Sequence, residues 1–455
     1  TSQWVDASIP VRADEPLQPI RLIGARNGSF SGQVVSSGSA LSGLKATVSD
    51  LKTADGQPAV IPSSAVQIRY ATKALFDGKV FDGLDEAPSA PAGSGQTATV
   101  QPVWITVRVS RDAKPGNYAG RLRIEVGGQK PVEVPVELSV ADFVIPDAQD
   151  FGGFLDVVDS PRSLALKYEV PMWSEEHWKL LDRNFELMGQ VGAKVVYLPI
   201  LPDTYFGNGE GMISWAKGAD GKLTPDFGPI DRYLDLAVKH LGKVPVVCAY
   251  LWDRRSGHAG ERPAEEVERL KRKGFTVHQE KGVPITLADS ATRQTSSGEG
   301  PKWGTDEARG FWKPVVDGLK ARLAKRGIEK SLVWGLATDC RPYKEVVADL
   351  KALAPEVPWA CHSHPGCENL YGQPVRYDVV VWGAPTLSAK MLAARKLGWQ
   401  NPRLVGTFPR QGAGGVGTIK DWMQPIKYRA GIEAMMICGW RGLGRIGGEF
   451  WPVLL

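Results

Sequence analysis

Short runs in which apolar and polar residues alternate fill the first third of the chain. In the segment 103–109 (VWITVRV), every second residue is Val or Ile. A period of two is typical of strands that bury one face, and the Gly, Ser, Pro and Asp clusters between such runs are typical of turns. The segment 112–118, with its Pro-Gly pair, predicts one of these turns. The pattern predicts a β-sandwich over residues 1–147.

The pattern changes after Pro146, where apolar runs begin to alternate with amphipathic helical segments. One predicted helix is 175–191, with Ser174 as its N-cap and Gly192 at its end. Eight apolar runs are predicted strands: 151–158, 194–200, 244–252, 331–338, 358–362, 377–382, 403–408 and 434–440. Strands that alternate with helices form parallel sheets, and eight is the strand number of a (β/α)8 barrel. We therefore expect an N-terminal β-sandwich followed by a (β/α)8 TIM-type barrel over residues 148–455.

Two connections in the predicted barrel are longer than the others. A hairpin is expected at 205–215, after the second strand, and a polar excursion at 253–304 follows the third strand. A loop as long as the excursion at 253–304 is typical of an active-site lid.

Composition and charge exclude several classes of protein. The 455 residues are 43% hydrophobic and 23% charged, which is enough to bury a large core. The net charge of +5 is mild for this length, and no dense Lys/Arg tract with aromatics occurs, so nucleic acid is not an expected partner. No run approaches the roughly 20 apolar residues of a membrane helix. Thr1 opens on a polar segment, and we expect a secreted or periplasmic protein whose signal has been removed.

The cysteines and tryptophans indicate the state of the thiols and the class of partner. Cys248, Cys340, Cys361 and Cys438 lie within or at the end of apolar runs, which favours buried thiols over a disulfide framework. Fifteen tryptophans are present. Flat aromatic faces stack on sugar rings, so a carbohydrate is the expected partner.

Candidate catalytic carboxylates lie at the ends of the predicted strands. Asp339 follows the fourth apolar run, and parallel α/β enzymes place their chemistry at the carboxyl ends of strands. Glu449, Asp253 and Asp156 are the candidates for a second catalytic carboxylate. A separation of ~5 Å between the two groups would favour retention, and ~6.5 to 9.5 Å would favour inversion.

Aromatic, histidine and arginine side chains fall at or just past the other predicted strand ends. The candidates for substrate binding are Tyr250, Trp252, Arg255, Arg341, His362, His364, Trp382, Arg410, Trp440 and Arg441. Aromatic rings and carboxylates together suit a carbohydrate, and the arginines would attract an anionic one such as a sulfated or uronic polysaccharide. The alternative is an ordinary polar barrel rim whose arginines neutralise its own carboxylates.

Three motifs have a second interpretation. His362 and His364 point the same way on a strand and would bind a metal together with Asp339, but hydrogen bonding to a sugar hydroxyl or to Asp339 is favoured, and no cofactor or metal is expected. The glycine-rich segment 412–417 is similar to a dinucleotide-binding loop, yet no second βαβ half follows it, which favours a flexible or anion-binding loop. Alternation turns Cys340 away from Asp339, which favours a buried structural cysteine over a nucleophile.

Several segments together resemble the family-123 glycoside hydrolases over nearly the whole chain. They are ARNGSFSGQ at 25–33, VSDL at 48–51, WITV at 104–107 and GNYAG at 116–120, followed by the barrel order. The resemblance implies a retaining β-N-acetylgalactosaminidase in which the acetamido oxygen of the substrate is the nucleophile. It also implies an Asp-Glu pair after the fourth strand, which stabilises the oxazolinium ion and donates the proton, with a Pro following. The matching residues here are Asp339, Cys340, Arg341 and Pro342.

Cys340 therefore stands where the family has its acid. A thiol with an unperturbed pKa of ~8.5 is a poor proton donor to a glycosidic oxygen. The leading hypothesis is a glycoside hydrolase that acts on a polysaccharide or glycan, with Asp339 and an acid from elsewhere or by a different mechanism. Two alternatives stay open: a non-catalytic carbohydrate-binding protein derived from such an enzyme, and a metal-dependent hydrolase using His362 and His364.

Overall fold

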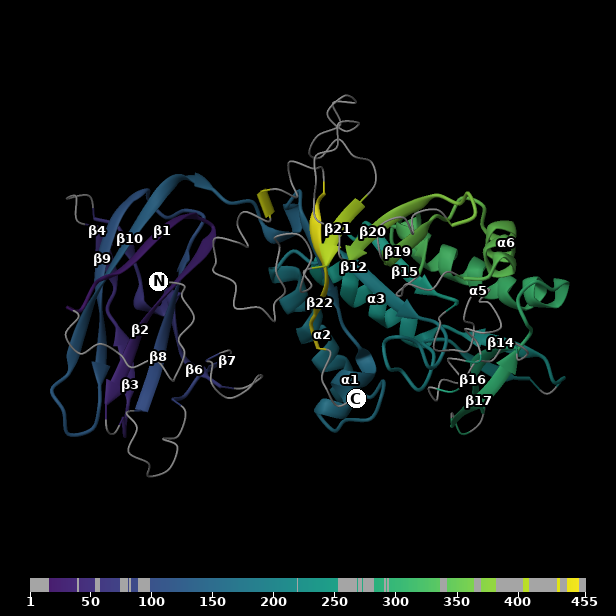
Figure 1. Cartoon of the computed structure of the whole chain (residues 1–455), viewed down its shortest axis with the longest axis horizontal. Coiled ribbons are helices and arrows are strands. Elements are labelled where there is room, and N and C mark those ends of the chain that lie inside the picture. Colours follow the sequence, from purple (N-terminus) through teal and green to yellow (C-terminus); the bar gives the residue numbers. More distant parts are fainter. Residues whose placement is uncertain are drawn as a thin grey trace. The chain divides into compact units, whose positions relative to one another are not determined.

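The computed structural model in Figure 1 divides into two compact units, Thr1–Asp147 and Ala148–Leu455. The described residues are 16–38, 41–53, 58–73, 81, 83–88, 99–218, 220–252, 268, 272, 282–289, 292, 294–335, 342–363, 370–381, 404–408, 432–433 and 440–449.

The first unit consists of two β-sheets. One has the order β1 (Ile20–Arg26), β10 (Val132–Val144), β9 (Gly116–Glu125), β4 (Leu51–Thr53) and β5 (Val60–Ile61), with β3 (Lys45–Val48) also beside β9. The other has the order β2 (Gly28–Gly38), β8 (Thr99–Val109), β6 (Val66–Thr72) and β7 (Gly83–Asp85). The described strand pairs are antiparallel except β1 with β10.

Both sheets contribute side chains to one hydrophobic core. The alternation predicted in β8 is confirmed, because Val103, Ile105 and Val107 are each fully buried. They share a cluster with Ile20 and Leu22 of β1, which belong to the other sheet. Full burial of a Val or Ile side chain stabilises the folded state by about 1.5–3 kcal/mol, so the strand period accounts for the face-to-face packing of the two sheets.

The turn predicted at 112–118 is confirmed. Gly116 has φ of +139°, a conformation that costs a residue with a side chain considerably more than glycine. The Tyr118 hydroxyl donates to the Lys114 carbonyl at 2.7 Å, which ties β9 back to the turn.

The second unit is organised around a parallel sheet of eight strands. Their order is β11 (Phe154–Val158), β22 (Gly442–Gly447), β21 (Leu404–Phe408), β20 (Val375–Val381), β19 (Trp359–Ser363), β18 (Leu332–Trp334), β15 (Val246–Tyr250) and β12 (Val195–Pro199). The two strands at the ends of this order also meet, since Leu155 forms a parallel bridge with Ala193. The Leu155 amide donates to the Gly192 carbonyl, and the Lys194 amide donates to the Leu155 carbonyl, each at 3.3 Å.

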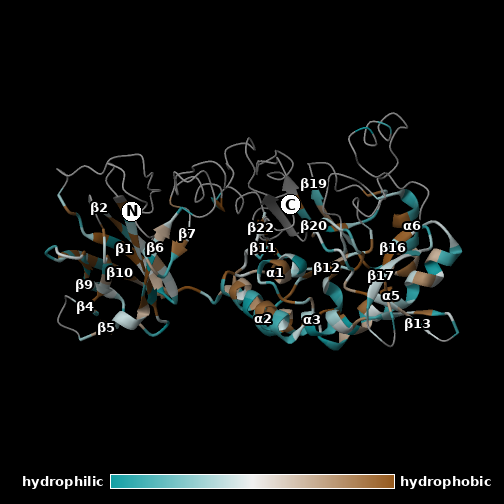
Figure 2. Cartoon of the chain, turned by 90° about the horizontal axis from the view of Figure 1, so that it is seen from below, coloured by the Kyte–Doolittle hydropathy of each residue, from teal (hydrophilic) through white to brown (hydrophobic). Residues whose placement is uncertain are grey.

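Helices connect many of these strands. They are α1 (Pro161–Lys167), α2 (Glu175–Gln190), α3 (Gly228–Leu241), α5 (Asp306–Lys325) and α6 (Lys344–Leu353). The described three-residue 3-10 helices are η1 (Ser63–Ala65) in the first unit, and η2 (Ala148–Asp150) and η3 (Glu329–Ser331) in the second. Figure 2 shows hydrophobic and hydrophilic residues interleaved along α2, α3 and α5, as amphipathic helices require. Among the described helices, none has the length and apolar character to cross a membrane.

The helix α2 confirms the predicted helix at 175–191. The Ser174 hydroxyl accepts a hydrogen bond from the His177 amide at 3.2 Å, which caps the first turn. Gly192 follows the helix with φ of +79° and allows the chain to turn into β12. Leu181 and Phe185 are fully buried between the helix and the sheet.

A second sheet, of four strands, arises from the connections after β12 and β15. Its order is β14 (Leu223–Asp226), β13 (Ser214–Lys217), β16 (Val283–Ala288) and β17 (Thr295–Gly300). The hairpin expected at 205–215 was wrong in position, because the pairing of β13 with β14 begins at Ser214. The described end of the excursion at 253–304 forms the β16–β17 hairpin. The sequence of β17 is polar and mostly exposed, so it has no apolar period from which this hairpin could be predicted.

The prediction of the eighth strand was also wrong in position. The strand in that place is β22, which begins at Gly442, past the predicted end at 440; residues 434–439 lie outside the described residues. Its sequence, GLGRIG, lacks an apolar run because of its glycines. A Cβ on Gly444 would lie 2.5 Å from Cγ1 of Val379 in β20, so only glycine fits at this position.

Candidate active site

Asp156 lies in the middle of β11 and is fully buried. Strand alternation places it on the same side of the sheet as Val158, which packs against a cluster separate from the one beneath the helices. We call this separate set the inner cluster: Val195, Tyr197, Phe206, Val246, Cys248, Tyr250, Val333, Ala360, Tyr377 and Val379. Asp156 is therefore a carboxylate set against a mostly apolar interior.

Two tyrosine hydroxyls bind this carboxylate. Tyr197 of β12 donates to Oδ1 at 2.6 Å, and Tyr377 of β20 donates to Oδ2 at 2.5 Å. Distances of 2.5–2.7 Å are those of charge-assisted O–H···O⁻ hydrogen bonds. Each oxygen of the Asp156 carboxyl group therefore accepts a phenol hydrogen bond.

His362 of β19 completes this group. Its Nε2 atom lies 3.2 Å from the Tyr197 hydroxyl oxygen and 3.8 Å from Oδ2 of Asp156. The imidazole meets the rings of Tyr197 and Tyr377 edge-on, with centroids 5.6 and 5.5 Å away. His362 is 2% exposed, so the ring is held by packing as well as by hydrogen bonds.

Burial and the charge of Asp156 keep both phenols protonated. Burial, followed by the nearby Asp156 carboxylate, raises the pKa of Tyr197 well above its usual value. The same two causes, in the same order, raise the pKa of Tyr377. Both hydroxyls remain donors over the range in which proteins are folded.

Tyr250 and Trp252 lie at the end of β15 and are both buried. The Tyr250 ring belongs to the inner cluster and meets Phe206 edge-on at 5.0 Å. A Cβ on Gly335, just past β18, would lie 2.6 Å from Cε2 of Tyr250, so a glycine is needed there. Trp252 is 2% exposed and packs in the cluster beneath the helices, so its ring face is covered in this structure.

Two further carboxyl groups follow the carboxyl ends of neighbouring strands. Asp159, after β11, is 3% exposed and accepts hydrogen bonds from the Tyr233 hydroxyl at 3.0 Å and from Nδ2 of Asn184 at 3.1 Å. Burial, assisted by the charge of Glu449, raises the pKa of Asp159 to about 6. Glu449, after β22, is half-buried, and its carbonyl accepts the Ser160 amide at 3.4 Å.

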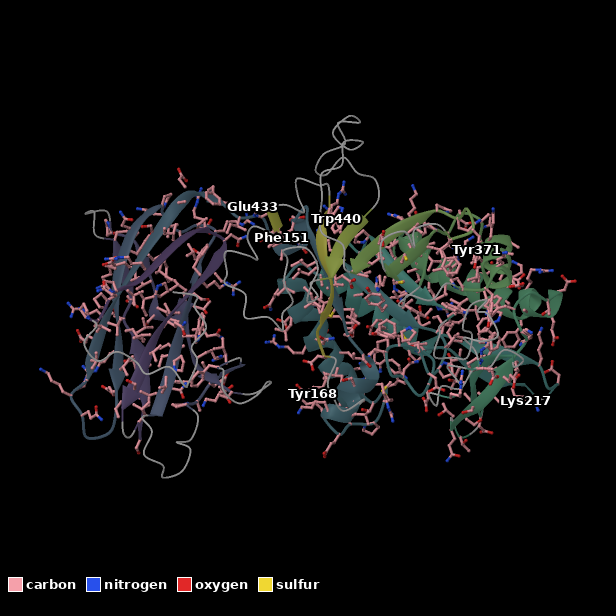
Figure 3. All side chains as sticks on the ribbon, viewed as in Figure 1. Phe151, Tyr168, Lys217, Tyr371, Glu433 and Trp440 are labelled. Carbon is pink, nitrogen blue, oxygen red and sulfur yellow. The ribbon has the colours of Figure 1, made fainter. Side chains whose placement is uncertain are left out.

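Trp440 and Arg441 precede β22 and so lie at the amino end of that strand. Figure 3 labels Trp440 at one end of β22 and Tyr168, which follows α1, at the other. The charge of Glu449 contributes to a raised pKa of Tyr168, after the larger effect of burial, which places Glu449 at the Tyr168 end. The strand shift thus separates Glu449 from Trp440 and Arg441, which were predicted to share a rim.

The remaining candidates lie outside the described residues. They are Asp253, Arg255, Asp339, Arg341, His364, Trp382 and Arg410. Among the described residues, no group of three or more His, Cys, Asp or Glu side chains could hold a metal ion. Two of the three residues of the metal hypothesis, His364 and Asp339, are outside that set.

Sequence reasoning missed the two tyrosines that bind Asp156. Tyr197 and Tyr377 sit inside apolar strand runs, where each looks like a core residue. The available signal was their period: each lies on the inward face of its strand, with Val195 or Val379 two residues away.

A hollow lies between the four-stranded sheet and α5. Its volume is about 570 Å³, and Trp215, Leu223, Gly300, Phe311 and Pro314 are among its lining residues. The Trp215 and Phe311 rings stack with centroids 3.9 Å apart. None of the described candidate residues lines this cavity.

An eight-stranded parallel sheet connected by helices defines an α/β protein, and a carboxylate, two phenols and an imidazole meet on one side of this sheet. A model for the glycoside hydrolase 123 catalytic domain matches residues 159–396, and one for the glycoside hydrolase 123 N-terminal domain matches residues 26–126. The first match alone spans more than half of the chain. The chain belongs to glycoside hydrolase family 123 and is a glycoside hydrolase.

One solved structure has a similar fold. The chain is similar to a family 123 glycoside hydrolase from Clostridium perfringens, studied for glycolipid glycan hydrolysis, with a TM-score of 0.65 and 14% identity over 95% of this chain and 74% of that one. A family 5 xyloglucanase from Bacteroides ovatus covers 93% of this chain and 91% of its own at 12% identity, but its TM-score of 0.24 carries no argument. No curated protein sequence matches the chain.

Proposed function

We propose that this glycoside hydrolase cleaves N-acetylhexosaminides in a glycan, with Asp339 as one catalytic carboxylate. The observation that carries the proposal is the catalytic-domain match over residues 159–396, which includes Asp339 at the end of the fourth strand run. The glycolipid glycan hydrolysis described for the Clostridium perfringens relative supports the same substrate class. The resemblance to the family assigns Asp339 the task of stabilising the oxazolinium ion.

We also propose that the second unit is a closed (β/α)8 barrel and the first a β-sandwich, with the boundary between residues 147 and 148. The Leu155–Ala193 bridge between the end strands of the parallel sheet supports closure. The core shared by the two sheets of the first unit supports the sandwich. Secretion or export to the periplasm, where glycans are accessible, is part of the same proposal.

We propose Glu449 as the proton donor, because Cys340, at the position of the family's acid, is a poor one. Glu449 is half-buried and follows the carboxyl end of β22, and parallel α/β enzymes place their chemistry at the carboxyl ends of strands. Asp253 is the second candidate, because it follows Trp252 directly after β15. Asp156 is less suited to meet a substrate, since hydroxyls bind both of its oxygens.

The test is hydrolysis of an aryl β-N-acetylgalactosaminide and of a panel of amino-sugar glycans by purified protein. Loss of a general acid costs about 10²–10⁴ in kcat, and loss of a group that stabilises developing charge costs about 10²–10³. On the glycans, Glu449→Gln and Asp339→Asn are therefore each expected to lower kcat by at least about 10². Glu433→Gln, an exposed glutamate that Figure 3 labels near the amino end of the sheet, is the matched control and is expected to keep full activity.

The outcomes separate the proposals. Unchanged turnover by Asp339→Asn refutes the main assignment, and unchanged turnover by Glu449→Gln moves the acid role to Asp253. An aryl substrate with a good leaving group needs no acid, so its hydrolysis by Glu449→Gln is expected to fall much less than that of the glycans.

A further inference from the structure

The hollow between the four-stranded sheet and α5 is lined by three parts of the second unit (Figure 1). They are the β13–β14 hairpin, the end of β17 and the first half of α5. On α5 the lining positions are 307, 310, 311 and 314, and this spacing of three and four residues places them on one face of the helix. That face of α5 is therefore turned towards open space rather than towards the core.

This helix face contains Gly310 and Pro314, the two residue types least favourable inside a helix. At Gly335 and Gly444 a Cβ would collide with a neighbouring side chain, so packing requires those glycines. At Gly310, in contrast, a Cβ would meet nothing within 4 Å, so its absence leaves the hollow wider without serving the packing. Pro314 has no N–H, so the Gly310 carbonyl lacks the donor that a regular helix supplies and is available to another group.

Phe311 gives the hollow an aromatic surface. One side of its ring stacks on the buried Trp215, with centroids 3.9 Å apart and an angle of 24° between the planes. Gly300 leaves room for the edge of the ring, since a Cβ there would lie 3.1 Å from Cε1 of Phe311. Phe311 is itself only half-buried. A ring that is fixed from one side and accessible from another suits the apolar C–H face of a sugar.

Three exposed charged residues also line the hollow: Lys222, Glu299 and Glu307. The turn of the β13–β14 hairpin fixes the backbone of Lys222, whose carbonyl accepts the Gly218 amide at 2.9 Å. The Gly282 amide donates to Oε1 of Glu299 and holds that side chain in place. One ammonium and two carboxylates supply a donor and acceptors for hydroxyl groups, without the excess of positive charge that attracts an anion.

We propose that this hollow is a second glycan-binding site of the glycoside hydrolase. It takes a neutral saccharide whose apolar face lies on Phe311 and whose hydroxyls face the charged residues and the Gly310 carbonyl. None of the described candidate residues for catalysis lines the hollow, so it would add affinity for a glycan without adding a catalytic group. The inference rests on membership of the family and not on the roles proposed for Asp339 and Glu449.

The experiment is limited acetylation of the protein by acetic anhydride, with the rate at each lysine measured by peptide mass spectrometry. The probes are N-acetylgalactosamine, N-acetylglucosamine and galactose, which have no glycosidic bond to cleave. At about ten times Kd only about one site in eleven is free, so we expect at least one of these sugars to slow acetylation of Lys222 by up to about tenfold. Lys325, exposed at the other end of α5, is the control and should react at an unchanged rate.

Two outcomes of this experiment overturn the proposal. The first is an unchanged rate at Lys222 with all three sugars, each at the highest concentration that dissolves. The second is protection by glucuronate and by none of the neutral sugars, which would show that the hollow selects an anion.

Variants test whether the protection arises in the hollow. Gly310→Leu fills it, and leucine is the better helix former, so the protein is expected to fold and Lys222 to react without protection by sugar. Ala324→Leu, at an exposed position later in α5, is the matched control and should keep the protection. Phe311→Leu retains an apolar contact with Trp215 but removes the ring, and should weaken the protection. If Gly310→Leu fails to fold, Phe311→Leu decides.

Persistent protection in the variant that decides shows that the sugar acts from elsewhere and refutes the site. A wild type that hydrolyses no amino-sugar glycan, but whose Lys222 is protected, refutes the proposed function and leaves the second site intact. Hydrolysis without protection of Lys222 has the opposite meaning.

Discussion

Replacing Asp159 by asparagine is expected to stabilise the protein at neutral pH. Asp159 is 3% exposed, and its carboxyl group accepts hydrogen bonds from Tyr233 and Asn184. These hydrogen bonds lower the pKa of Asp159 by less than burial and the charge of Glu449 raise it, so the pKa rises from 3.8 to about 6. An asparagine of the same shape removes the ionisable group and keeps an oxygen acceptor for the Tyr233 hydroxyl.

The magnitude follows from the difference between the folded and unfolded pKa values. Below about pH 4 the group is protonated in both states and costs nothing. Between pH 4 and 6 the unfolded chain loses its proton while the folded protein retains it, so stability falls as the pH rises. The difference of 6 − 3.8 units, at 1.36 kcal/mol per unit, amounts to about 3 kcal/mol by pH 7.

The assay is urea unfolding followed by tryptophan fluorescence, at intervals between about pH 4 and 7.5. The free energy of unfolding of Asp159→Asn minus that of the wild type is expected to rise by about 3 kcal/mol across this range. Asp112→Asn, at an exposed aspartate in the first unit, is the control substitution. A flat difference for Asp159→Asn would refute the reasoning, because it would show that Asp159 ionises alike in both states.

Two substitutions test the packing and the cap that shape the second unit. Gly444→Ala places a Cβ 2.5 Å from Cγ1 of Val379 and is expected to destabilise the protein by about 1–3 kcal/mol in thermal unfolding; adding Val379→Ala should recover part of the loss, and no recovery would contradict the proposed clash. Ser174→Ala removes the oxygen that accepts the His177 amide and should cost about 1 kcal/mol in urea unfolding. The exposed Ser296→Ala serves as its control, and equal effects for the two would refute the capping role.

The layout of the fold was predictable because its signals are local. The period of two in β8 and the cap and stop residues of α2 each lie within a few positions of the element that they define. The strand β22 escaped prediction for the opposite reason. Its glycine at 444 is required by Val379 of β20, a contact 65 positions away in the chain that no local pattern reveals.

The candidate site was predictable only in part for the same physical reason. His362 and Asp156 were singled out by residue type, but their partners come from distant strands. Tyr197 lies 41 positions from Asp156, and Tyr377 lies 221 positions from it. Both tyrosines occupy apolar runs in which a phenol ring is a normal core residue, so only the assembled sheet shows that their hydroxyls meet at one carboxylate.

Asp156 and Asp159 show how strand geometry separates two carboxyl groups that the sequence places three residues apart. Asp156 lies within β11, whereas Asp159 follows the end of the strand, and the two groups contact different elements. Asp156 meets two hydroxyl protons and an imidazole in the inner cluster, whereas Asp159 meets Tyr233 of α3 and Asn184 of α2 in the layer between sheet and helices. Asp159 therefore ties β11 to two helices, and its charge state affects stability. Asp156 instead ties β11 to β12 and β20 through the two phenols. If both groups served the substrate directly, Asp159→Asn would abolish activity, while the geometry here predicts that its main effect is on stability, because two helices bind the Asp159 carboxyl group.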